Sequence, residues 1–338
     1  MAKLVSVKGP HARGPIGNIR VQWNMGNQCN YNCEYCPPIL HDGSRPWLSL
    51  DTYLTTVDRL CTHYNNQNKR VDFELIGGEV TVMPGFEDVI RRISEYRTNS
   101  VVFTNASRTI NWWSKAKEYL DGVVITFHPK TQTREHLVAV INEIKDHVTI
   151  DINIAGVAGE VESLGEWVED LRNLFLNCER NRYDSVSICV KTMYAKLLGR
   201  NSKQETYWPY NEAELEVLRR PGIKPSPCPP PDPDAPQFPP PDPTAWMTEF
   251  LYDDGTAKYV QSHLIINEGL NKFKGMKCSL GFESINIDAS GDIYSSWCGA
   301  KHFGNISNLD SWELPSLETE CPFDFCNNIS DIAITKIA

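Results

Sequence analysis

The chain has 338 residues, of which 41% are apolar, and a formal net charge of −10. A chain of this length can bury a large core, and no segment stays apolar long enough to cross a bilayer, so we expect no membrane partner. The acidic balance and the absence of a long Lys/Arg run disfavour nucleic acid as a partner, because binding to phosphates requires clustered cations.

At the amino terminus, the first fifteen residues contain basic residues, glycine and proline, and no apolar stretch typical of a secretory signal. We therefore expect a cytoplasmic protein. Its eleven cysteines would stay reduced in that compartment, so their spacing points to metal ligation before disulfide bonding.

Between residues 19 and 190, short β-branched runs alternate with longer amphipathic stretches, which is the pattern of parallel strands joined by crossover helices. Six such strands with helices outside predict an α/β fold, a partial (β/α)6 barrel of the TIM type. Its ligand site is expected at the carboxyl ends of the strands. The expected strands are Ile19–Asn24, Val71–Ile76, Val101–Thr104, Val123–Thr126, Val148–Ile154 and Ser185–Val190, and the expected helices are Leu50–Tyr64, Thr133–Lys145 and Leu164–Asn177.

The pattern changes after the last of these strands. Residues 221–243 hold twelve of the chain's twenty-two prolines, which excludes a central strand or a helix interior and predicts a stiff connector. A docking site for a proline-reading partner is the alternative for this stretch. Further on, alternating isoleucines predict a hairpin of Ser284–Asp288 and Ile293–Trp297. The expected parts are the barrel in 1–200, a helix and proline-rich connector in 201–243, and a small module in 244–338.

Three cysteines, Cys29, Cys33 and Cys36, lie within eight residues, directly after the first expected strand. A cubane of four irons normally takes four protein ligands, so three close cysteines leave one iron open to another ligand. The C-x3-C-x2-C spacing, with Tyr35 before the last cysteine, resembles the loop of the radical S-adenosylmethionine (radical SAM) superfamily. A zinc knuckle completed by His41 is the alternative.

The resemblance implies a [4Fe–4S] cluster on these three cysteines, with S-adenosylmethionine on the open iron and Tyr35 among the cofactor-binding residues. Reductive cleavage of that cofactor would give methionine and a 5′-deoxyadenosyl radical that abstracts hydrogen from a substrate. An electron donor of the flavodoxin or ferredoxin type is then required.

A glycine pair and a carboxylate, Gly77-Gly78-Glu79, end the second expected strand. They resemble the superfamily's GGE(P) motif, with Val80 in place of the proline, and the resemblance implies that Gly77, Gly78 and Glu79 hold the methionine ammonium. Taken alone, the same residues could form an ordinary turn from a strand to a helix.

Two further positions follow the third and fourth expected strands. Thr104-Asn105-Ala106-Ser107 resembles the superfamily's T-N-G segment, with Ala106 in place of glycine, which implies that Asn105 faces the ribose. His128 is expected at the barrel mouth, near cofactor or substrate. As a lone histidine, it could equally be a capping or surface group.

A second group of cysteines surrounds the predicted hairpin. Cys278 precedes the hairpin, Cys298 follows it, and Cys321 and Cys326 come after a further loop, so four thiols could converge on one closed centre. The arrangement resembles the shortened auxiliary-cluster module called twitch, related to the SPASM module, and implies a second [4Fe–4S] cluster. Zinc on the same four cysteines is the alternative.

The resemblance implies an enzyme and leaves its substrate open. Auxiliary-cluster modules are frequent among maturases of ribosomally synthesised peptides, so modification of a precursor peptide is the leading hypothesis. A leader peptide would need a separate recognition protein, because too few residues precede the first expected strand for a fused recognition domain. The alternatives are a radical SAM dehydrogenase of an aminocyclitol or sugar, and a structural zinc protein that is no enzyme. No catalytic residue is assigned.

Overall fold

The computed structural model of the chain includes both predicted groups of cysteines, at residues 29–36 and 278–326, and most of the predicted strands. The described residues are 2–9, 18–161, 164–165, 167–168, 170–171, 186–192, 194–196, 206–207, 210–214, 247–260, 265–266, 268–308, 312–314 and 318–338. The proline-rich stretch 221–243, Cys178 and Cys228 lie outside them, as does the side chain of Cys189.

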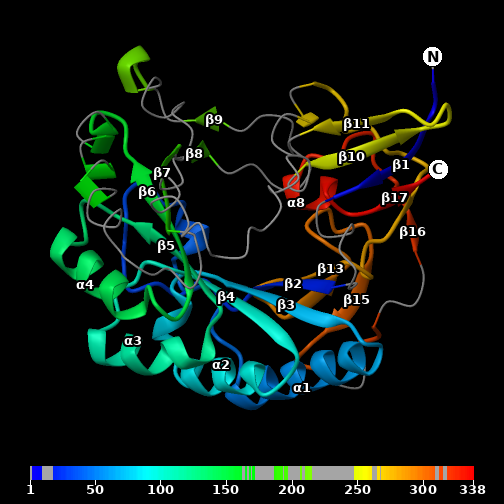
Figure 1. The fold of residues 1–338 in the computed structure, drawn as a ribbon. Coiled ribbons are helices and arrows are strands. Elements are labelled where there is room, and N and C mark those ends of the chain that lie inside the picture. The colour runs from blue at the N-terminus through cyan, green and yellow to red at the C-terminus, as the bar shows by residue number, and fades with distance from the viewer. Residues whose placement is uncertain are drawn as a thin grey trace, which may run out of the picture.

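Nine strands form the larger of the two main sheets (Figure 1). In chain order they are β2 (Asn18–Asn24), β3 (Arg70–Ile76), β4 (Thr98–Thr104), β5 (Gly122–Phe127), β6 (Thr149–Gly156), β7 (Val186–Thr192), β13 (Ser284–Ile287), β14 (Asp292–Tyr294) and β15 (His302–Asn305). From β2 to β7, each strand pairs in parallel with the next, so the six predicted strands and their order are confirmed. Among the described residues the sheet is open, with β15 and β7 at its edges.

The predicted hairpin is present and joins this sheet. Strand β13 pairs antiparallel with β14 and in parallel with β2, so a segment from the last quarter of the chain continues the large sheet beside its first parallel strand. The hairpin therefore connects the two cysteine-bearing regions through backbone hydrogen bonds.

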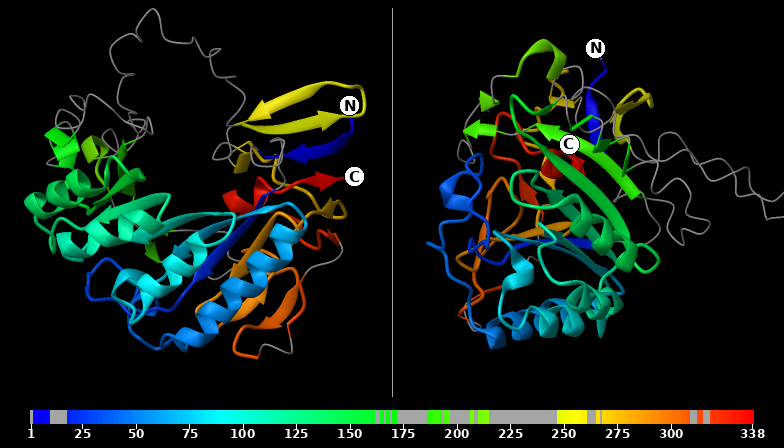
Figure 2. Two further views of the ribbon diagram at one scale, coloured as in Figure 1. Left: turned by 60° about the horizontal axis from the view of Figure 1, so that its bottom comes forward. Right: turned by 90° about the vertical axis from the view of Figure 1, so that its left-hand side faces the viewer.

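Four α-helices lie along one face of the large sheet (Figures 1 and 2). They are α1 (Leu50–Asn66), α2 (Phe86–Ser94), α3 (Ile110–Ala116) and α4 (Arg134–Ile144). Helix α1 buries side chains three and four positions apart, including Tyr53, Val57 and Leu60, as its periodicity predicts. The Ser49 side chain accepts a hydrogen bond from the Thr52 amide and begins this helix. The helices predicted at 50–64 and 133–145 are confirmed, whereas the one at 164–177 falls largely outside the described residues.

The second main sheet has six short strands in the order β11-β10-β1-β17-β12-β16, and it combines both ends of the described chain. Strand β1 pairs antiparallel with β10 on one side and with β17 on the other. This sheet and the short helix α8 (Ile329–Ile332) lie across the large sheet from α1 (Figures 1 and 2). The six strands are β1 (Leu4–Lys8), β10 (Thr248–Tyr252), β11 (Ala257–Val260), β12 (Lys277–Cys278), β16 (Thr319–Glu320) and β17 (Lys336–Ile337).

Within the described residues, none of the helices combines the length and the apolar character that a membrane span requires. The remaining elements are short. They are the strands β8 (Tyr194–Lys196) and β9 (Thr206–Tyr207), which pair with each other, and the 3-10 helices η2 (Pro38–Leu40), η3 (Val80–Val82) and η4 (Lys117–Tyr119).

Candidate active site

The loop that carries Cys29, Cys33 and Cys36 follows the carboxyl end of β2, where the sequence placed it. Asn27, only 2% exposed, holds the base of this loop. Its side-chain amide donates to the Ile39 carbonyl at 2.9 Å and to the Asp42 carboxylate at 2.6 Å, and its oxygen accepts from the Arg45 amide at 2.8 Å. Sequence reasoning missed this residue, because its partners lie twelve to eighteen positions away.

The Gly77-Gly78-Glu79 segment after β3 lies directly against the same loop. The Gly78 amide donates to the Gly26 carbonyl at 3.0 Å, and the Glu79 amide donates to the Gln28 carbonyl at 2.9 Å. A Cβ on Gly77 would lie 2.6 Å from the Gly26 carbonyl oxygen, and one on Gly78 would lie 2.2 Å from the Gln28 carbonyl oxygen. Both positions therefore need glycine so that the two backbones can approach each other.

Glu79 is fully buried at this junction. One carboxylate oxygen accepts hydrogen bonds from the Thr81 amide and hydroxyl, at 3.1 and 2.5 Å, and from the Thr104 hydroxyl at 2.7 Å. The other accepts from the Asn105 amide at 2.5 Å. Burial raises the pKa of the Glu79 carboxyl, against the opposing effect of these hydrogen bonds. The carboxylate thus ties the ends of β3 and β4 together beneath the cysteine loop.

Val80, which stands where the GGE(P) motif has proline, is the first residue of η3, and Glu79 caps that helix. Proline is common at this helical position but is not required there. Ala106, which stands where the T-N-G segment has glycine, has a φ of 56°, a left-handed conformation that glycine adopts without strain. Val80 and Ala106 therefore replace residues whose role at these positions is to favour a particular backbone conformation.

Asn105 lies beside the first cysteine. Its side-chain amide donates to the Asn30 side chain at 3.0 Å and lies 4.0 Å from the Cys29 sulfur. The structure therefore brings Asn105 to the predicted cofactor edge.

His128, directly after β5, reaches the second cysteine. Its Nδ1 lies 2.7 Å from the Tyr35 hydroxyl and 3.7 Å from the Cys33 sulfur, and its ring stacks on that of Tyr35 at an interplanar angle of 10°. Burial lowers the pKa of His128 to about 4, so the imidazole is neutral at pH 7. His128 and Tyr35 thus join the cysteine loop to the end of β5.

Gln132 links this histidine to Asn105, and no sequence motif pointed to it. Its side-chain oxygen accepts from the His128 amide at 2.8 Å, and its amide group donates to the Asn105 carbonyl. Gln132 is 8% exposed, so both bonds are shielded from water. The side chain fixes the ends of β4 and β5 relative to each other.

The three thiols lie in a partly apolar environment, where Cys33 and Tyr35 pack against Ala155 and Val157. Burial raises the pKa of Cys36 to about 11 and raises that of Cys29, and the charge of Cys33 adds to both shifts. A bound metal would therefore have to displace the protons of these thiols. Among the described residues, no three Cys, His, Asp or Glu side chains form a preassembled cage for a single metal ion.

The four C-terminal cysteines come from two adjoining apolar clusters. Cys278 packs with Cys298 in one, and Cys321 packs with Cys326 in the other. Burial, with smaller contributions from the charges of Asp331, Cys278 and Cys321 and against that of Lys336, raises the pKa of Cys326 to about 12. Backbone hydrogen bonds from Cys321 to Met276 and from Cys326 to Asn271, at 2.9 and 2.8 Å, hold their segment against the residues that precede Cys278.

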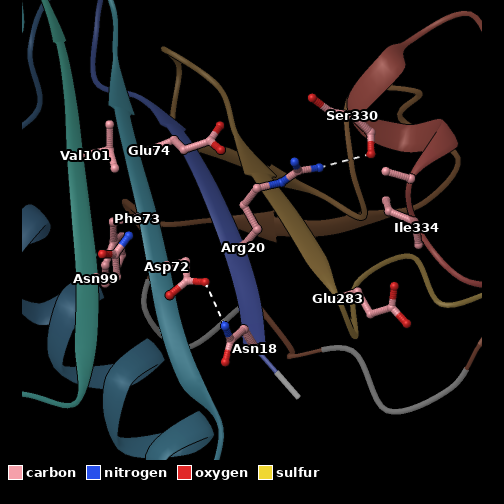
Figure 3. A pocket seen from close by; sticks show the side chains of 11 residues that line it. Asn18, Arg20, Asp72, Phe73, Glu74, Asn99, Val101, Glu283, Ser330 and Ile334 are labelled. Carbon is pink, nitrogen blue, oxygen red and sulfur yellow. Dashed lines mark hydrogen bonds between the residues drawn. The ribbon is translucent and has the colours of Figure 1, made fainter. Parts of the chain in front are cut away.

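Two cavities lie at opposite ends of the parallel strands. One of about 440 Å³ is beside Cys29 and is lined also by Trp47 and His41. The other, of about 220 Å³, is at the amino-terminal half of the strands, where Arg20 reaches across to the Ser330 carbonyl of α8 at 3.0 Å (Figure 3). The cavity beside Cys29 lies at the end of the strands where the sequence places the cofactor.

No family model matches the chain, and no curated protein matches it in sequence. The fold is similar to that of native anSMEcpe with bound AdoMet (S-adenosylmethionine), at 12% identity over 86% of this chain and 78% of that one, with a TM-score of 0.50. A weaker similarity is to BtrN in complex with AdoMet and 2-DOIA, at 12% identity over 86% of this chain and 78% of that one, with a TM-score of 0.40. Another is to Streptococcus suis SuiB bound to precursor peptide SuiA, at 10% identity over 83% of this chain and 60% of that one, with a TM-score of 0.33. The chain therefore shares the fold of a solved protein that carries bound AdoMet, which agrees with the predicted resemblance at the level of the fold.

Proposed function

We propose that the protein is a radical SAM enzyme, with Cys29, Cys33 and Cys36 as the ligands of a catalytic [4Fe–4S] cluster. One observation carries the proposal. The cysteine loop is hydrogen-bonded to the Gly77-Gly78-Glu79 segment, and Asn105 and His128 reach the same loop from the ends of β4 and β5. Motifs that are separate in the sequence thus surround one set of thiols.

The donor set suits such a cluster. Thiolates are the usual protein ligands of iron–sulfur clusters, and three of them leave an iron vacant. S-adenosylmethionine bound at that iron would supply the 5′-deoxyadenosyl radical. The roles left to this chain are to hold the cofactor beside Cys29 through Asn105 and the glycine segment, and to shape the site through the Tyr35–His128 contact.

The finer architecture is part of the same proposal. Residues 1–200 form a partial (β/α)6 barrel, 201–243 a connector, and 244–338 a twitch-like module in which Cys278, Cys298, Cys321 and Cys326 bind an auxiliary [4Fe–4S] cluster. Neighbouring cysteines of this group are among the charges that raise the pKa of Cys278, Cys298 and Cys326, which supports a shared centre. Strand β1, from the amino terminus, would complete the sheet of that module.

A precursor peptide is the favoured substrate, because the four buried or half-buried C-terminal thiols resemble the module of peptide maturases. The enzyme would then require a separate leader-recognition protein and an electron donor of the flavodoxin or ferredoxin type. A small-molecule dehydrogenase acting on an aminocyclitol or sugar is the second candidate.

The decisive test is anaerobic reconstitution followed by incubation with dithionite and S-adenosylmethionine. We expect about eight irons per chain and release of 5′-deoxyadenosine. Replacing Cys29, Cys33 and Cys36 together by alanine should leave about four irons and no 5′-deoxyadenosine. Cys61→Ala is the matched control, because Cys61 is buried in α1 away from both groups and should retain iron and cleavage. Cleavage by the triple variant, or a zinc-loaded and colourless wild-type protein, would refute the proposal.

A second experiment separates the two substrate classes. The reconstituted enzyme is incubated with any short peptide encoded beside its gene, and separately with an aminocyclitol, and both mixtures are analysed by mass spectrometry. A change in the mass of the peptide supports the maturase, and loss of two hydrogens from the cyclitol supports the dehydrogenase.

A further inference from the structure

A lysine is buried in the C-terminal sheet beside the four cysteines. Lys336, in β17, is 1% exposed, although lysine is almost never fully buried without partners. Its Nζ donates to the backbone carbonyls of Asp331, Ile332 and Ile334 at 2.7, 3.1 and 2.8 Å. An ammonium has three donors, so all three are satisfied and the positive charge is fixed in place.

The strand register brings this charge next to the thiols. Cys278 and Lys336 are directly paired residues of the antiparallel strands β12 and β17, so their side chains project from the same face of the sheet. The Lys336 Nζ also lies 4.8 Å from the centre of the Phe273 ring, which belongs to the apolar cluster of Cys321 and Cys326. The positive charge opposes the effect of burial on the pKa of Cys278 and of Cys326.

A buried carboxyl group, that of Asp331, lies next to Lys336 and beside Cys298. Asp331, 1% exposed, accepts hydrogen bonds from the Cys298 amide at 2.7 Å and from the Ser296 hydroxyl. Burial raises the pKa of Cys298, and the charge of Asp331 raises it further. Burial raises the pKa of Asp331, against the opposing effects of its hydrogen bonds and of Lys336, so two neighbouring buried ionisable side chains lie beside the same group of thiols.

We propose that Lys336 and Asp331 are positioning charges that set the reduction potential of the iron–sulfur cluster on Cys278, Cys298, Cys321 and Cys326, Lys336 raising it and Asp331 lowering it. The inference rests on the proposed function, because it requires that cluster. Reduction moves one electron from an external donor, here dithionite, onto the cluster and makes it more negative by one charge. A nearby cation stabilises this reduced form, and a nearby anion destabilises it.

The size of the effect follows from Coulomb's law. At an effective interior dielectric constant of about 20, one charge at about 10 Å changes the equilibrium roughly tenfold. The alternative is that Lys336 only caps the carbonyls around α8, a structural role that would affect folding but not the potential.

The test uses the full chain with Cys29, Cys33 and Cys36 replaced by alanine, so that only the C-terminal cluster remains. Each protein is reconstituted and titrated with dithionite under electron paramagnetic resonance. Lys336→Met should lower the ratio of reduced to oxidised cluster at a given potential about tenfold, which is 59 mV for one electron. Asp331→Asn keeps the shape of the side chain and should move the ratio in the opposite direction. Lys336→Arg, the matched control, retains the charge and should stay near the parent protein.

The outcomes separate the inference from the proposal on which it rests. If the parent protein binds no iron, the C-terminal cluster and this inference both fail, whereas the catalytic cluster on Cys29, Cys33 and Cys36 is still tested by iron binding and S-adenosylmethionine cleavage in the wild-type protein. If it binds iron but Lys336→Met and Asp331→Asn titrate like the parent, the inference alone is overturned. If Lys336→Met does not fold, Asp331→Asn decides, since an unchanged or lowered potential in that variant overturns the inference and a raised one supports it.

Discussion

Replacing Gly78 by alanine tests whether the contact between the two loops holds the candidate site together. The new Cβ would lie 2.2 Å from the Gln28 carbonyl oxygen, whereas real Cβ atoms essentially never come within 3.0 Å of such an atom. The loops must therefore move apart, which disrupts the hydrogen bonds from Gly78 to Gly26 and from Glu79 to Gln28. Because the obstacle is backbone on both sides, no side-chain rotation can relieve it.

The expected cost is the sum of overpacking and two lost backbone hydrogen bonds. Overpacking costs about 1–3 kcal/mol, and each bond contributes about 1 kcal/mol, so the free energy of unfolding should fall by roughly 3–5 kcal/mol. At about 2–4 °C per kcal/mol, the melting temperature should fall by roughly 6 °C or more. Thermal melting of the metal-free protein, followed by circular dichroism, measures the change.

Gly122→Ala is the matched control. It introduces the same methyl group, but the nearest atoms are the Thr149 hydroxyl at 2.7 Å and a Val101 methyl at 3.1 Å, which are side-chain atoms that can shift. We expect it to melt clearly above Gly78→Ala. If the two variants melt within about 1 °C of each other, the loop contact is not the constraint described here.

Three further predictions concern buried polar groups. Tyr53→Phe removes a hydroxyl that donates to the Met25 carbonyl at 2.6 Å, and we expect a loss of about 1–3 kcal/mol in urea unfolding; an unchanged midpoint would contradict it. Gln132→Ala should leave iron binding intact but weaken S-adenosylmethionine binding, measured by calorimetry, because the ends of β4 and β5 lose their link; equal affinity in both proteins would exclude this role. Burial raises the pKa of Glu79, so the folded protein binds its proton more tightly than the unfolded chain. The stability of wild type relative to Glu79→Gln should therefore rise as the pH falls through the raised pKa toward the ordinary value near 4.5, and a pH-independent difference would refute it.

The parallel strands could be predicted from the sequence, because each is a short apolar run between polar connections and the chain order fixes their neighbours. The cysteine loop and the Gly77-Gly78-Glu79 segment could also be found, because their spacing is local. The sequence could not reveal why glycine is needed at 77 and 78, since the obstacle is the backbone at residues 26–28.

Contacts between distant segments could not be predicted either, because the two partners lie far apart in the sequence. Leu4–Lys8 was not predicted as a strand, because it lies outside the alternating pattern of strands and helices and its partners lie more than 240 positions further along the chain. Lys336 and Asp331 are charged residues that ordinarily lie at the surface, and only the folded sheet reveals that they are buried. The pattern of apolar and polar residues therefore predicted the parallel sheet better than it predicted the surroundings of the second cysteine group.

The position of β1 has a consequence for the order in which this protein can be made. Strand β1 leaves the ribosome long before its two partners, since it lies between β10 and β17 in the sheet. The helix-backed parallel sheet can begin to form during synthesis, whereas the sheet around the C-terminal thiols has to wait until β17 has been made. During that interval the earliest strand has to remain unpaired and free of other chains.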